Sequence, residues 1–489
     1  MSERDVAALL LPAVRWHAER GFDEARPTIE RALELGVGGF IFFGGPADAV
    51  RELVRELHAR SRLPLLVGAD LERGAGQQFA GLTGLPPLAA VASLGDPEVV
   101  RRAARLTARE ARRVGVNWVY GPVCDLDVEP DNPIVGTRAI GGDPAVVAEM
   151  AAEWVDGCQA EGVLACAKHF PGHGRTTGDS HMELPVVRAS ADTLYAEDLT
   201  PFRAAIDAGV ASVMSAHVAF PALDASGAPA TLSVSILRDV LRRQLRFDGL
   251  VVTDALIMDG VRGDGEAAAV VRALGAGCDL LLYPDDLPGV VRALQKALRD
   301  GALDPERVDD ALRRRHRWAE WAAPVAAAVD DAPLAADAWG DEVAEQVVHA
   351  LHGRVPRLAP VTEVVVVDDD LGGPYPPPSR EPLLAALAGA GVDARRVERP
   401  TAASRGPVVV ALFGDIRSWK GRPGYSAAAR EAVATACAEA RRQARDAVVV
   451  QFSHPRLADA IEGADAVVCA WGGERVMQAA AARWLARQG

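Results

Sequence analysis

Cysteine is scarce in this sequence, and its spacing excludes two kinds of protein. The six cysteines among 489 residues are scattered, and no two form a Cys-x-x-Cys pair. This pattern gives neither the disulfide framework of a small secreted domain nor the spacing of a zinc site, and a reduced, cytoplasmic environment suits it best. The positions are Cys124, Cys158, Cys166, Cys278, Cys437 and Cys469.

The sequence also lacks a long apolar run and an excess of positive charge. The apolar stretch at residues 6–14 has charges on both sides and neither a basic start nor a small-residue cleavage site, so we expect no secretion signal and no membrane span. The 67 acidic residues outnumber the 53 basic ones, for a net charge of −14. Since a polyanion would be repelled, we expect neither nucleic acid nor an anionic membrane as a partner.

Lysine is nearly absent, because only Lys168, Lys296 and Lys420 stand among the 53 basic residues. A GC-rich coding bias would explain arginine elsewhere. A lysine that survives such a bias stands there by chance, or where a compact ammonium cannot be exchanged for a planar guanidinium. Lys296 lies in a pattern typical of a surface helix, so Lys168 is the more interesting of the first two.

Short apolar runs alternate with Ala/Arg/Glu-rich stretches of helical spacing up to about residue 285. This alternation is typical of parallel βα units. Eight such runs predict an α/β fold in the form of a closed (β/α)8 barrel, with an open doubly wound sheet as the alternative. The runs are Ala7–Val14, Gly38–Phe43, Leu65–Ala69, Val116–Gly121, Val163–Ala167, Ala211–Ser215, Leu250–Thr253 and Asp279–Tyr283.

A low-complexity segment, AAPVAAAVDDAPLAADAW, follows the barrel pattern. It is poor in large apolar residues, which is typical of a linker. Beyond it, four apolar runs alternate again with helical segments and predict a smaller α/β sandwich. We therefore expect a catalytic barrel over residues 1–325, a linker over 326–357 and a C-terminal α/β sandwich domain over 358–489.

The loop after the fifth predicted strand concentrates residues that carry chemistry. Residues 167–185, AKHFPGHGRTTGDSHMELP, hold three of the ten histidines, one lysine and one aspartate among glycines and prolines. Asp179 and His181 can face one side of an extended segment, where the carboxylate would orient and charge-stabilise the imidazole. This pair predicts a general acid/base dyad. The alternative is a loop whose polar side chains satisfy its own backbone.

The seventh predicted strand, GLVVT, stops at Asp254, which places a carboxylate where barrel enzymes carry their chemistry. Asp254 is therefore a candidate nucleophile. An aspartate after a strand is also a common helix N-cap, so that reading stays open. His217, after the sixth predicted strand, is expected to be structural.

Charged residues follow two other strands. Asp70 comes after the third, and Asp125 and Arg138 come after the fourth. A carboxylate such as Asp70 and cations such as Lys168 and Arg138 can each hydrogen-bond to vicinal hydroxyls, which favours a polyhydroxylated ligand. The alternatives are that Asp125 holds a loop and that His169 is a satisfied buried histidine.

These motifs together resemble family 3 glycoside hydrolases, specifically their β-N-acetylglucosaminidase branch. The resemblance rests on KHFPGHG followed by four residues and DSH, on VVTDAL and on NPIVGTRAIGGDP. It implies a retaining double displacement in which Asp254 attacks the anomeric carbon. His181, paired with Asp179, would protonate the leaving oxygen and then activate the acceptor. The resemblance further implies that the terminal sugar is bound by Asp70, Arg138, Lys168 and His169.

The resemblance implies a carbohydrate substrate, namely β-linked N-acetylglucosaminides such as cell-wall or chitin fragments, and no cofactor. A histidine acid/base puts no second anion beside the acceptor. A phosphorylase that releases sugar 1-phosphate therefore stays open as an alternative, as does a β-glucosidase. The stretch Asp70–Gln78, DLERGAGQQ, departs from the family's D-x-E-G-G-R-V-x-R pattern, so the edge of the sugar pocket is expected to differ.

Two rivals come from other classes of protein. One is a metal-dependent barrel hydrolase whose ligands would be His169, His173, His181 and Asp254, and the other is a catalytically silent sugar-binding protein. The C-terminal domain resembles the second domain of longer family 3 members. Its loop Arg417–Ser426, RSWKGRPGYS, predicts a cationic aromatic patch for a further sugar subsite or another subunit, which leaves a homo-oligomer open. The alternative is a plain solvated loop.

Overall fold

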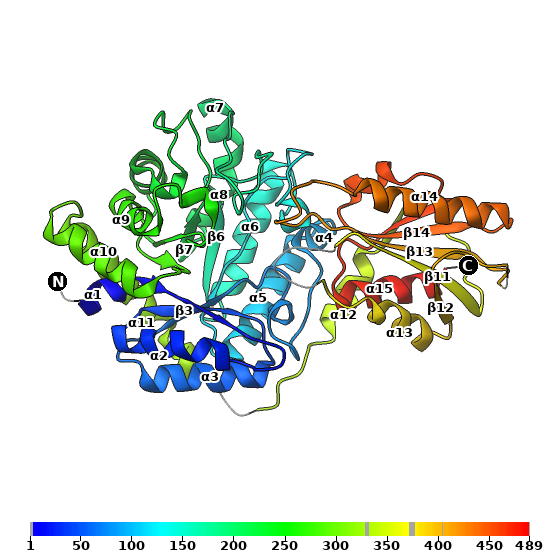
Figure 1. The fold of residues 1–489 in the computed structure, drawn as a ribbon, viewed down its shortest axis with the longest axis horizontal. Coiled ribbons are helices and arrows are strands. Elements are labelled where there is room, and N and C mark those ends of the chain that lie inside the picture. Colours follow the sequence, from blue (N-terminus) through cyan, green and yellow to red (C-terminus); the bar gives the residue numbers. More distant parts are fainter. Residues whose placement is uncertain (1–2, 328–331, 371–376, 403, 489) are drawn as a thin grey trace. The chain divides into compact units, whose positions relative to one another are not determined.

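The computed structural model describes residues 3–327, 332–370, 377–402 and 404–488. It divides into two compact units, drawn in Figure 1. The first comprises Met1–Thr83, Asp96–Glu129 and Ala139–Ala336, and the second comprises Gly84–Gly95, Pro130–Arg138 and Asp337–Gly489.

The parallel strands of the first unit close into a ring. Strands β2 to β8 pair in chain order, β9 pairs in parallel with β1, and an isolated bridge between Val252 and Leu280 joins β8 to β9. The predicted closed (β/α)8 barrel is therefore confirmed, in place of an open sheet. The strands are β1 (Leu10–Leu11), β2 (Ala13–Arg15), β3 (Gly39–Phe43), β4 (Leu66–Ala69), β5 (Trp118–Val119), β6 (Leu164–Phe170), β7 (Ser212–Ser215), β8 (Leu250–Thr253) and β9 (Leu281–Leu282).

The first predicted strand, Ala7–Val14, is shorter in the structure. Ala7 ends a helix, and β1 and β2 are two pieces of one strand separated by Pro12, which has no N–H to give to a sheet. The barrel interior is filled by large side chains. Trp118 and Tyr120 pack edge to face at 5.0 Å, and a Cβ on Gly68 would lie 2.4 Å from the Tyr120 hydroxyl, so only glycine fits there.

Helices alternate with the strands, and several begin in the same way. Asp96, Asp143 and Asp286 each accept backbone N–H groups at a helix start, and a proline stands in the first turn, where a missing N–H costs nothing. The α-helices are α1 (Glu3–Ala7), α2 (Arg26–Leu35), α3 (Ala47–Arg60), α5 (Pro97–Arg113), α6 (Pro144–Gln159), α7 (Ala191–Thr193), α8 (Leu199–Asp207), α9 (Glu266–Ala276), α10 (Leu287–Arg299) and α11 (Pro305–Ala327). The 3-10 helices are η1 (Asp23–Ala25), η2 (Ala75–Gln77), η5 (Ala230–Leu232) and η7 (Asp259–Val261), and the π-helices are η4 (Leu194–Asp198) and η6 (Ser235–Gln244).

The second unit is an α/β sandwich around a sheet of order β10-β15-β14-β13-β11-β12, in which only β10 among the described strands is antiparallel. Buried apolar clusters cover both faces of the sheet; α12, α13 and α15 lie on one face and α14 on the other (Figure 1). The elements are α4 (Leu88–Ala92), η3 (Gly136–Arg138), α12 (Trp339–Val347), β10 (His349–His352), β11 (Val361–Asp368), α13 (Glu381–Gly389), β12 (Asp393–Val397), β13 (Val408–Phe413), α14 (Ala427–Arg442), β14 (Ala447–Phe452), η8 (Pro455–Ala460), β15 (Ala466–Cys469) and α15 (Arg475–Ala486).

The predicted linker, residues 326–357, contains two of these elements, α12 and β10, while its residues 328–331 lie outside the described residues. Val343 and Val347 of α12 are buried, and β10 pairs with β15. The second unit therefore takes up chain from Asp337 onwards. The composition of the segment did not predict these elements, because a nine-residue helix needs few large apolar side chains to pack against the rest of its unit.

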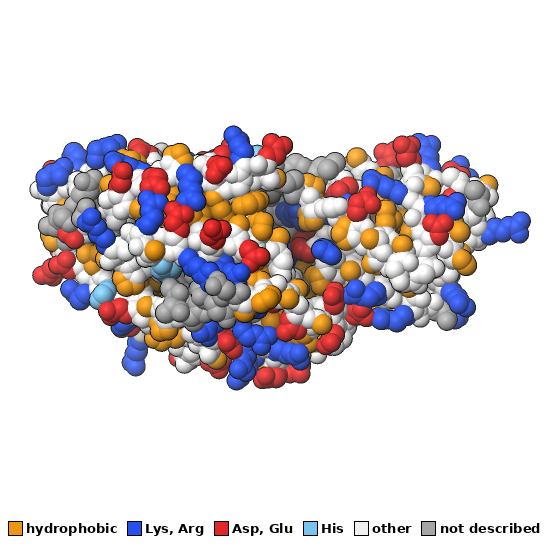
Figure 2. Space-filling view, turned by 90° about the horizontal axis from the view of Figure 1, so that it is seen from below, with side chains coloured by type: hydrophobic (Ala, Val, Ile, Leu, Met, Phe, Trp, Pro, Cys, Tyr) orange, Lys and Arg blue, Asp and Glu red, His pale blue; other side chains and the backbone are white. Residues whose placement is uncertain are grey.

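Acidic and basic side chains are interspersed over the face shown in Figure 2, without a broad field of either sign. Among the described helices, none combines the length and the apolar character needed to cross a bilayer.

Candidate active site

Lys168 lies on strand β6, near the C-terminal end of the strand. Lys168 Nζ donates to Asp70 Oδ1 at 2.6 Å and pairs with Glu72 Oε1 at 2.7 Å. The Lys168 side chain is only 2% exposed, whereas that of Asp70, after β4, is 31% exposed. A buried ammonium needs such partners, and a guanidinium could not present one compact charge to both carboxylates. Asp70 thus remains the group that a ligand hydroxyl can reach.

Asp125 is fully buried and orients the histidine that follows Lys168. Its Oδ2 lies 2.7 Å from Nδ1 of His169, and its Oδ1 accepts the backbone N–H groups of His169 and His173. Burial alone would raise the pKa of Asp125, but the His169 and His173 imidazoles and these hydrogen bonds lower it. Because Nδ1 of His169 is occupied, Nε2 is the nitrogen left for a ligand.

His173 is locked inside the same loop. Its two ring nitrogens lie 2.8 Å from Thr176 Oγ1 and 2.8 Å from Ser180 Oγ. Burial lowers the pKa of His173 to about 4, so the ring is neutral at physiological pH. The close approach of this loop to the preceding one requires Gly174, where a Cβ would lie 1.8 Å from the Leu126 carbonyl oxygen. We assign His173 to loop structure.

Asp179 and His181 form the predicted dyad, with Nδ1 of His181 at 2.7 Å from Asp179 Oδ1. The segment is a turn rather than the extended stretch expected from the sequence, since Met182 and Glu183 both donate to the Asp179 carbonyl and His181 N–H donates to its carboxylate. An aspartate that bonds the N–H two residues on makes such a turn. The carboxylate fixes the tautomer with hydrogen on Nδ1, so Nε2 is the atom that can exchange a proton.

Asp254 directly follows β8 and is partly exposed. Its Oδ1 accepts the N–H of Ala255 at 2.7 Å, and its second oxygen has no hydrogen-bond partner among the described residues. Burial alone would raise the pKa of Asp254, but the nearby imidazoles of His169, His217 and His181 lower it to about 2. Asp254 does not cap a helix in the structure. It is an ionised carboxylate with one oxygen held and the other available.

The loops that follow β6 and β8 are joined, which brings the dyad and Asp254 to one site. Asp259 N–H donates to the His181 carbonyl at 3.4 Å, and Gly260 N–H donates to the Ser180 carbonyl at 3.2 Å. A Cβ on Gly260 would lie 2.8 Å from that Ser180 oxygen, so the two loops approach as closely as backbone allows. The imidazole of His181 consequently acts on the Asp254 carboxylate electrostatically.

Arg138 is the one predicted sugar-binding residue outside the barrel, because it ends η3 in a segment that belongs to the second unit. Its role stays a prediction.

Within the described ranges, no three His, Cys, Asp or Glu side chains are arranged to hold a metal ion, so the ligand set of the metal-hydrolase alternative does not come together. The sequence analysis did not predict Glu72 as a partner of Lys168. Its position two residues after Asp70, in DLE, could have indicated that both carboxylates lie near the same lysine.

A cavity of about 660 Å³ lies at the other end of the barrel. Its lining includes Ala8, Val37 and Leu63, which precede β1, β3 and β4, and the buried Arg315, which donates to the Gly38 and Pro64 carbonyls. Reactive groups of (β/α)8 barrels follow their strands, so this cavity is not the reaction site.

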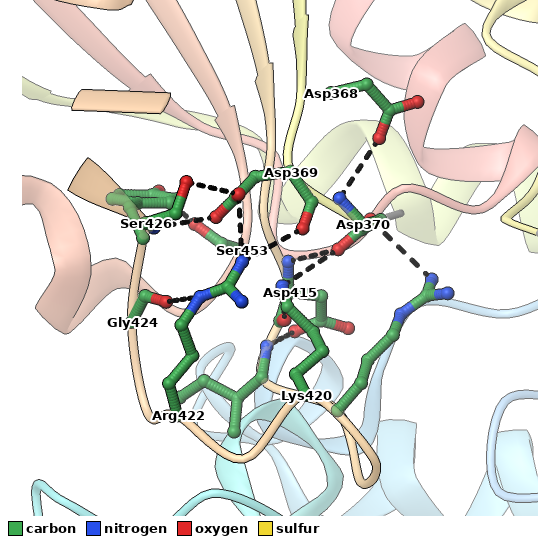
Figure 3. A network of polar contacts seen from close by, with 12 residues as sticks. Asp368, Asp369, Asp370, Asp415, Lys420, Arg422, Gly424, Ser426 and Ser453 are labelled. Carbon is green, nitrogen blue, oxygen red and sulfur yellow. Dashed lines mark hydrogen bonds and ion pairs between the residues drawn. The ribbon is translucent and has the colours of Figure 1, made fainter. Parts of the chain in front are cut away.

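The second unit has its own cluster of carboxylates after parallel strands, drawn in Figure 3. Asp370 is buried between Arg380 Nη2 at 3.0 Å and Lys420 Nζ at 3.3 Å, while Asp369 accepts from Ser426 and pairs with Arg422 at 2.8 Å. In the loop Arg417–Ser426, Lys420 and Arg422 pair with these aspartates; the Lys420 side chain is 5% exposed and that of Arg422 is 34% exposed. The ligand-binding role of this loop stays a prediction.

Carboxylates and imidazoles gathered at the C-terminal ends of strands in a closed (β/α)8 barrel define a barrel enzyme with general acid/base groups. Residues 5–317 match the family model described as the glycosyl hydrolase family 3 N-terminal domain. The chain therefore belongs to glycosyl hydrolase family 3 and is a glycoside hydrolase with a carbohydrate substrate.

Individual relatives agree with this assignment. A β-N-acetylglucosaminidase/β-glucosidase of Cellulomonas fimi is 38% identical over 295 residues, which are 57% of this chain and 51% of that protein. The chain thus spans about half the length of that relative. A β-hexosaminidase of Thiobacillus denitrificans is 40% identical over 50% of this chain and 71% of its own length. The structure of a family 3 β-N-acetylglucosaminidase from Paenibacillus is similar with a TM-score of 0.87 and 27% identity, covering 99% of this chain and 96% of that one.

Proposed function

We propose that this chain removes terminal β-linked N-acetylglucosamine by a retaining double displacement. The observation that carries the proposal is Asp254, an ionised carboxylate with one oxygen held by Ala255 N–H and the other unengaged, joined by paired loops to the Asp179–His181 dyad. The preference for N-acetylglucosamine is supported by what the relatives are named, and the motifs KHFPGHG and DSH support the same branch of the family.

In the first step, the free oxygen of Asp254 attacks the anomeric carbon and His181 Nε2 gives its proton to the leaving oxygen. In the second step, the neutral imidazole takes a proton from the acceptor, which then displaces Asp254. Asp179 acts in both steps because it stabilises the imidazolium whenever the ring is charged. Asp70, the Nε2 of His169 and, by family resemblance, Arg138 hold the hydroxyls of the terminal sugar, while Lys168 fixes Asp70 in place.

The substrate source and location are part of the proposal. Cell-wall or chitin fragments are the β-N-acetylglucosaminides that we propose as natural substrates. We place the reaction in the cytoplasm, which is supported by six cysteines that are all buried as free thiols.

The test is incubation with 4-nitrophenyl β-N-acetylglucosaminide and the matching β-glucoside, each with and without phosphate, followed by mass analysis of the sugar product. Free N-acetylglucosamine at the same rate in both buffers is the expected result. A phosphate-dependent rate with sugar 1-phosphate as product would show a phosphorylase instead. A faster reaction with the glucoside would replace the proposed substrate with a glucoside, and no turnover of either would contradict the proposal.

A further inference from the structure

His217 is completely buried, and the mechanism above gives it no task. It follows β7, on the strand that neighbours β8 and Asp254. Its Nε2 lies 3.2 Å from the Ala255 carbonyl oxygen, and its Nδ1 lies 2.8 Å from Thr231 Oγ1. Both ring nitrogens are therefore used within the protein, so the ring has no nitrogen left for a substrate.

The hydrogen positions follow from what each partner can do. A carbonyl only accepts, so Nε2 must carry the hydrogen in the bond to Ala255. In a neutral ring Nδ1 then accepts from the Thr231 hydroxyl, and Ser215 Oγ in turn donates to Thr231 Oγ1 at 3.0 Å. Burial lowers the pKa of His217, although Asp254 opposes this, so the neutral ring is the stable form at physiological pH.

The Ala255–Leu256 peptide is held from both neighbouring strands. Its C=O accepts from His217 beside β7, and its N–H donates to the Leu282 carbonyl on β9 at 2.9 Å. The preceding residue is anchored as well, because Asp254 N–H donates to the Ser215 carbonyl at 3.2 Å. With both flanking peptides fixed, the Ala255 N–H has one direction in which to point, and that direction is the Asp254 carboxylate.

We propose that His217 is a positioning residue, which aims the Asp254 carboxylate by holding the Ala255 carbonyl through Nε2. The inference rests on the proposed role of Asp254 as nucleophile. Its physical basis is that the attacking oxygen must lie in line with the scissile bond, where a displacement of about 1 Å can cost on the order of 100-fold in rate. A ring clamped between Thr231 and Ala255 supplies that constraint without touching the sugar.

The first test compares His217→Phe, which keeps a ring but removes both hydrogen bonds, with His217→Gln, which keeps a donor near the position of Nε2. For 4-nitrophenyl β-N-acetylglucosaminide we expect kcat to fall about 10- to 100-fold in H217F with KM within about twofold, and to recover to within about fivefold of wild type in H217Q. A kcat within twofold of wild type in H217F, or no recovery in H217Q, would overturn the proposal.

The second test asks whether His217 acts through Asp254. In a D254G background, added azide can replace the missing nucleophile, and the rate then no longer depends on where a carboxylate points. We expect D254G and the D254G/H217F double variant to have equal azide-rescued rates within about twofold. A further 10-fold loss in the double variant would show that His217 acts otherwise. Should D254G keep wild-type turnover without azide, the proposed nucleophile itself would be refuted, a different result from either outcome above.

Thr231→Val covers the case in which H217F does not fold. This substitution keeps the side-chain volume and leaves His217 in place, but removes the hydroxyl that holds Nδ1. We expect kcat to fall about 3- to 10-fold, again with little change in KM. A rate equal to wild type in T231V would contradict the clamp.

Discussion

The barrel and the second unit each end a buried parallel strand with aspartate, and we propose a catalytic role for only the one in the barrel. In the barrel, the β8 run LVVT is followed by Asp254; in the second unit, the β11 run VTEVVVVD is followed by Asp369 and Asp370. By sequence pattern, the second cluster is the more acidic of the two. By structure, it is the one that is neutralised.

The difference lies in the partners of the carboxylates. Asp370 lies between a guanidinium and an ammonium and accepts the N–H of Asp415, and the Arg380 guanidinium is itself stacked over Phe413 at 3.9 Å. Asp254 pairs with no lysine or arginine among the described residues, and the titratable groups that act on it are imidazoles. Arginine stays protonated at every physiological pH, whereas histidine can gain and lose a proton. A permanent ion pair fixes structure, while a titratable neighbour leaves a carboxylate available for chemistry.

The largest effect that this comparison predicts is on the rate. Asp254→Asn removes the charge of the proposed nucleophile and keeps the shape of the side chain, so kcat/KM should fall by about 10³- to 10⁵-fold. The matched control is Asp369→Asn, at the corresponding strand end of the second unit, which should leave kcat/KM within about threefold of wild type. The measurement is steady-state hydrolysis of 4-nitrophenyl β-N-acetylglucosaminide. Equal losses in both variants would erase the distinction between the two clusters.

His181→Ala should separate substrates by their leaving groups. A nitrophenolate departs without a proton, so kcat/KM for the nitrophenyl substrate should fall about 10-fold or less, whereas an alkyl or sugar leaving group should lose about 10²- to 10⁴-fold. The comparison of nitrophenyl and methyl β-N-acetylglucosaminides measures this split. Asp179→Asn should follow the same order with smaller losses, because it leaves the imidazole present but less well oriented. A uniform loss across leaving groups would remove His181 from the acid/base role.

Asp370→Asn should affect stability rather than rate. The side chain is fully buried, and removing its charge leaves Lys420 and part of Arg380 without their counter-ion, so the free energy of unfolding should fall by about 3 kcal/mol. Urea unfolding followed by circular dichroism measures the change. The control is Asp393→Asn, whose pair with Arg395 is more than half exposed and should contribute less than about 1 kcal/mol. If D370N were as stable as D393N, the network in Figure 3 would not be a structural one.

The sequence predicted features that depend on neighbouring residues and missed those that depend on partners far along the chain. Local periodicity, which is written in consecutive residues, predicts the eight strands and places Asp70 and Asp254 directly after two of them. Lys168 was expected just after its strand and lies inside β6, which continues to Phe170. Which strand-end carboxylate is neutralised depends on partners that lie far along the chain, since Asp370 and Lys420 are 50 residues apart. Composition made RSWKGRPGYS resemble a ligand-binding patch, whereas its pairing with Asp369 and Asp370, about 50 residues earlier, carries no local signal.

The smallest predicted effect is on the acid dependence of the free energy of unfolding, which we compare for Asp254 and Asp369. The pKa of Asp254 is lowered to about 2 in the folded protein from an ordinary 3.8, so its charge stabilises the fold above about pH 4, and this contribution is lost as the pH falls toward 2. The two values correspond to about 2 kcal/mol. D254N lacks the titration, so its free energy of unfolding should fall less steeply than that of wild type between pH 4 and pH 2.

Burial alone would raise the pKa of Asp369, but its bonds to Ser426 and Arg422 lower it. The free energy of unfolding of D369N should therefore also fall less steeply than that of wild type in acid. Urea titrations at each pH test both variants. At neutral pH we expect only D254N to lose activity. If D254N and D369N depend on acid in the same way in their free energy of unfolding but differ in kcat/KM, both carboxylates stabilise the fold and only Asp254 takes part in the reaction.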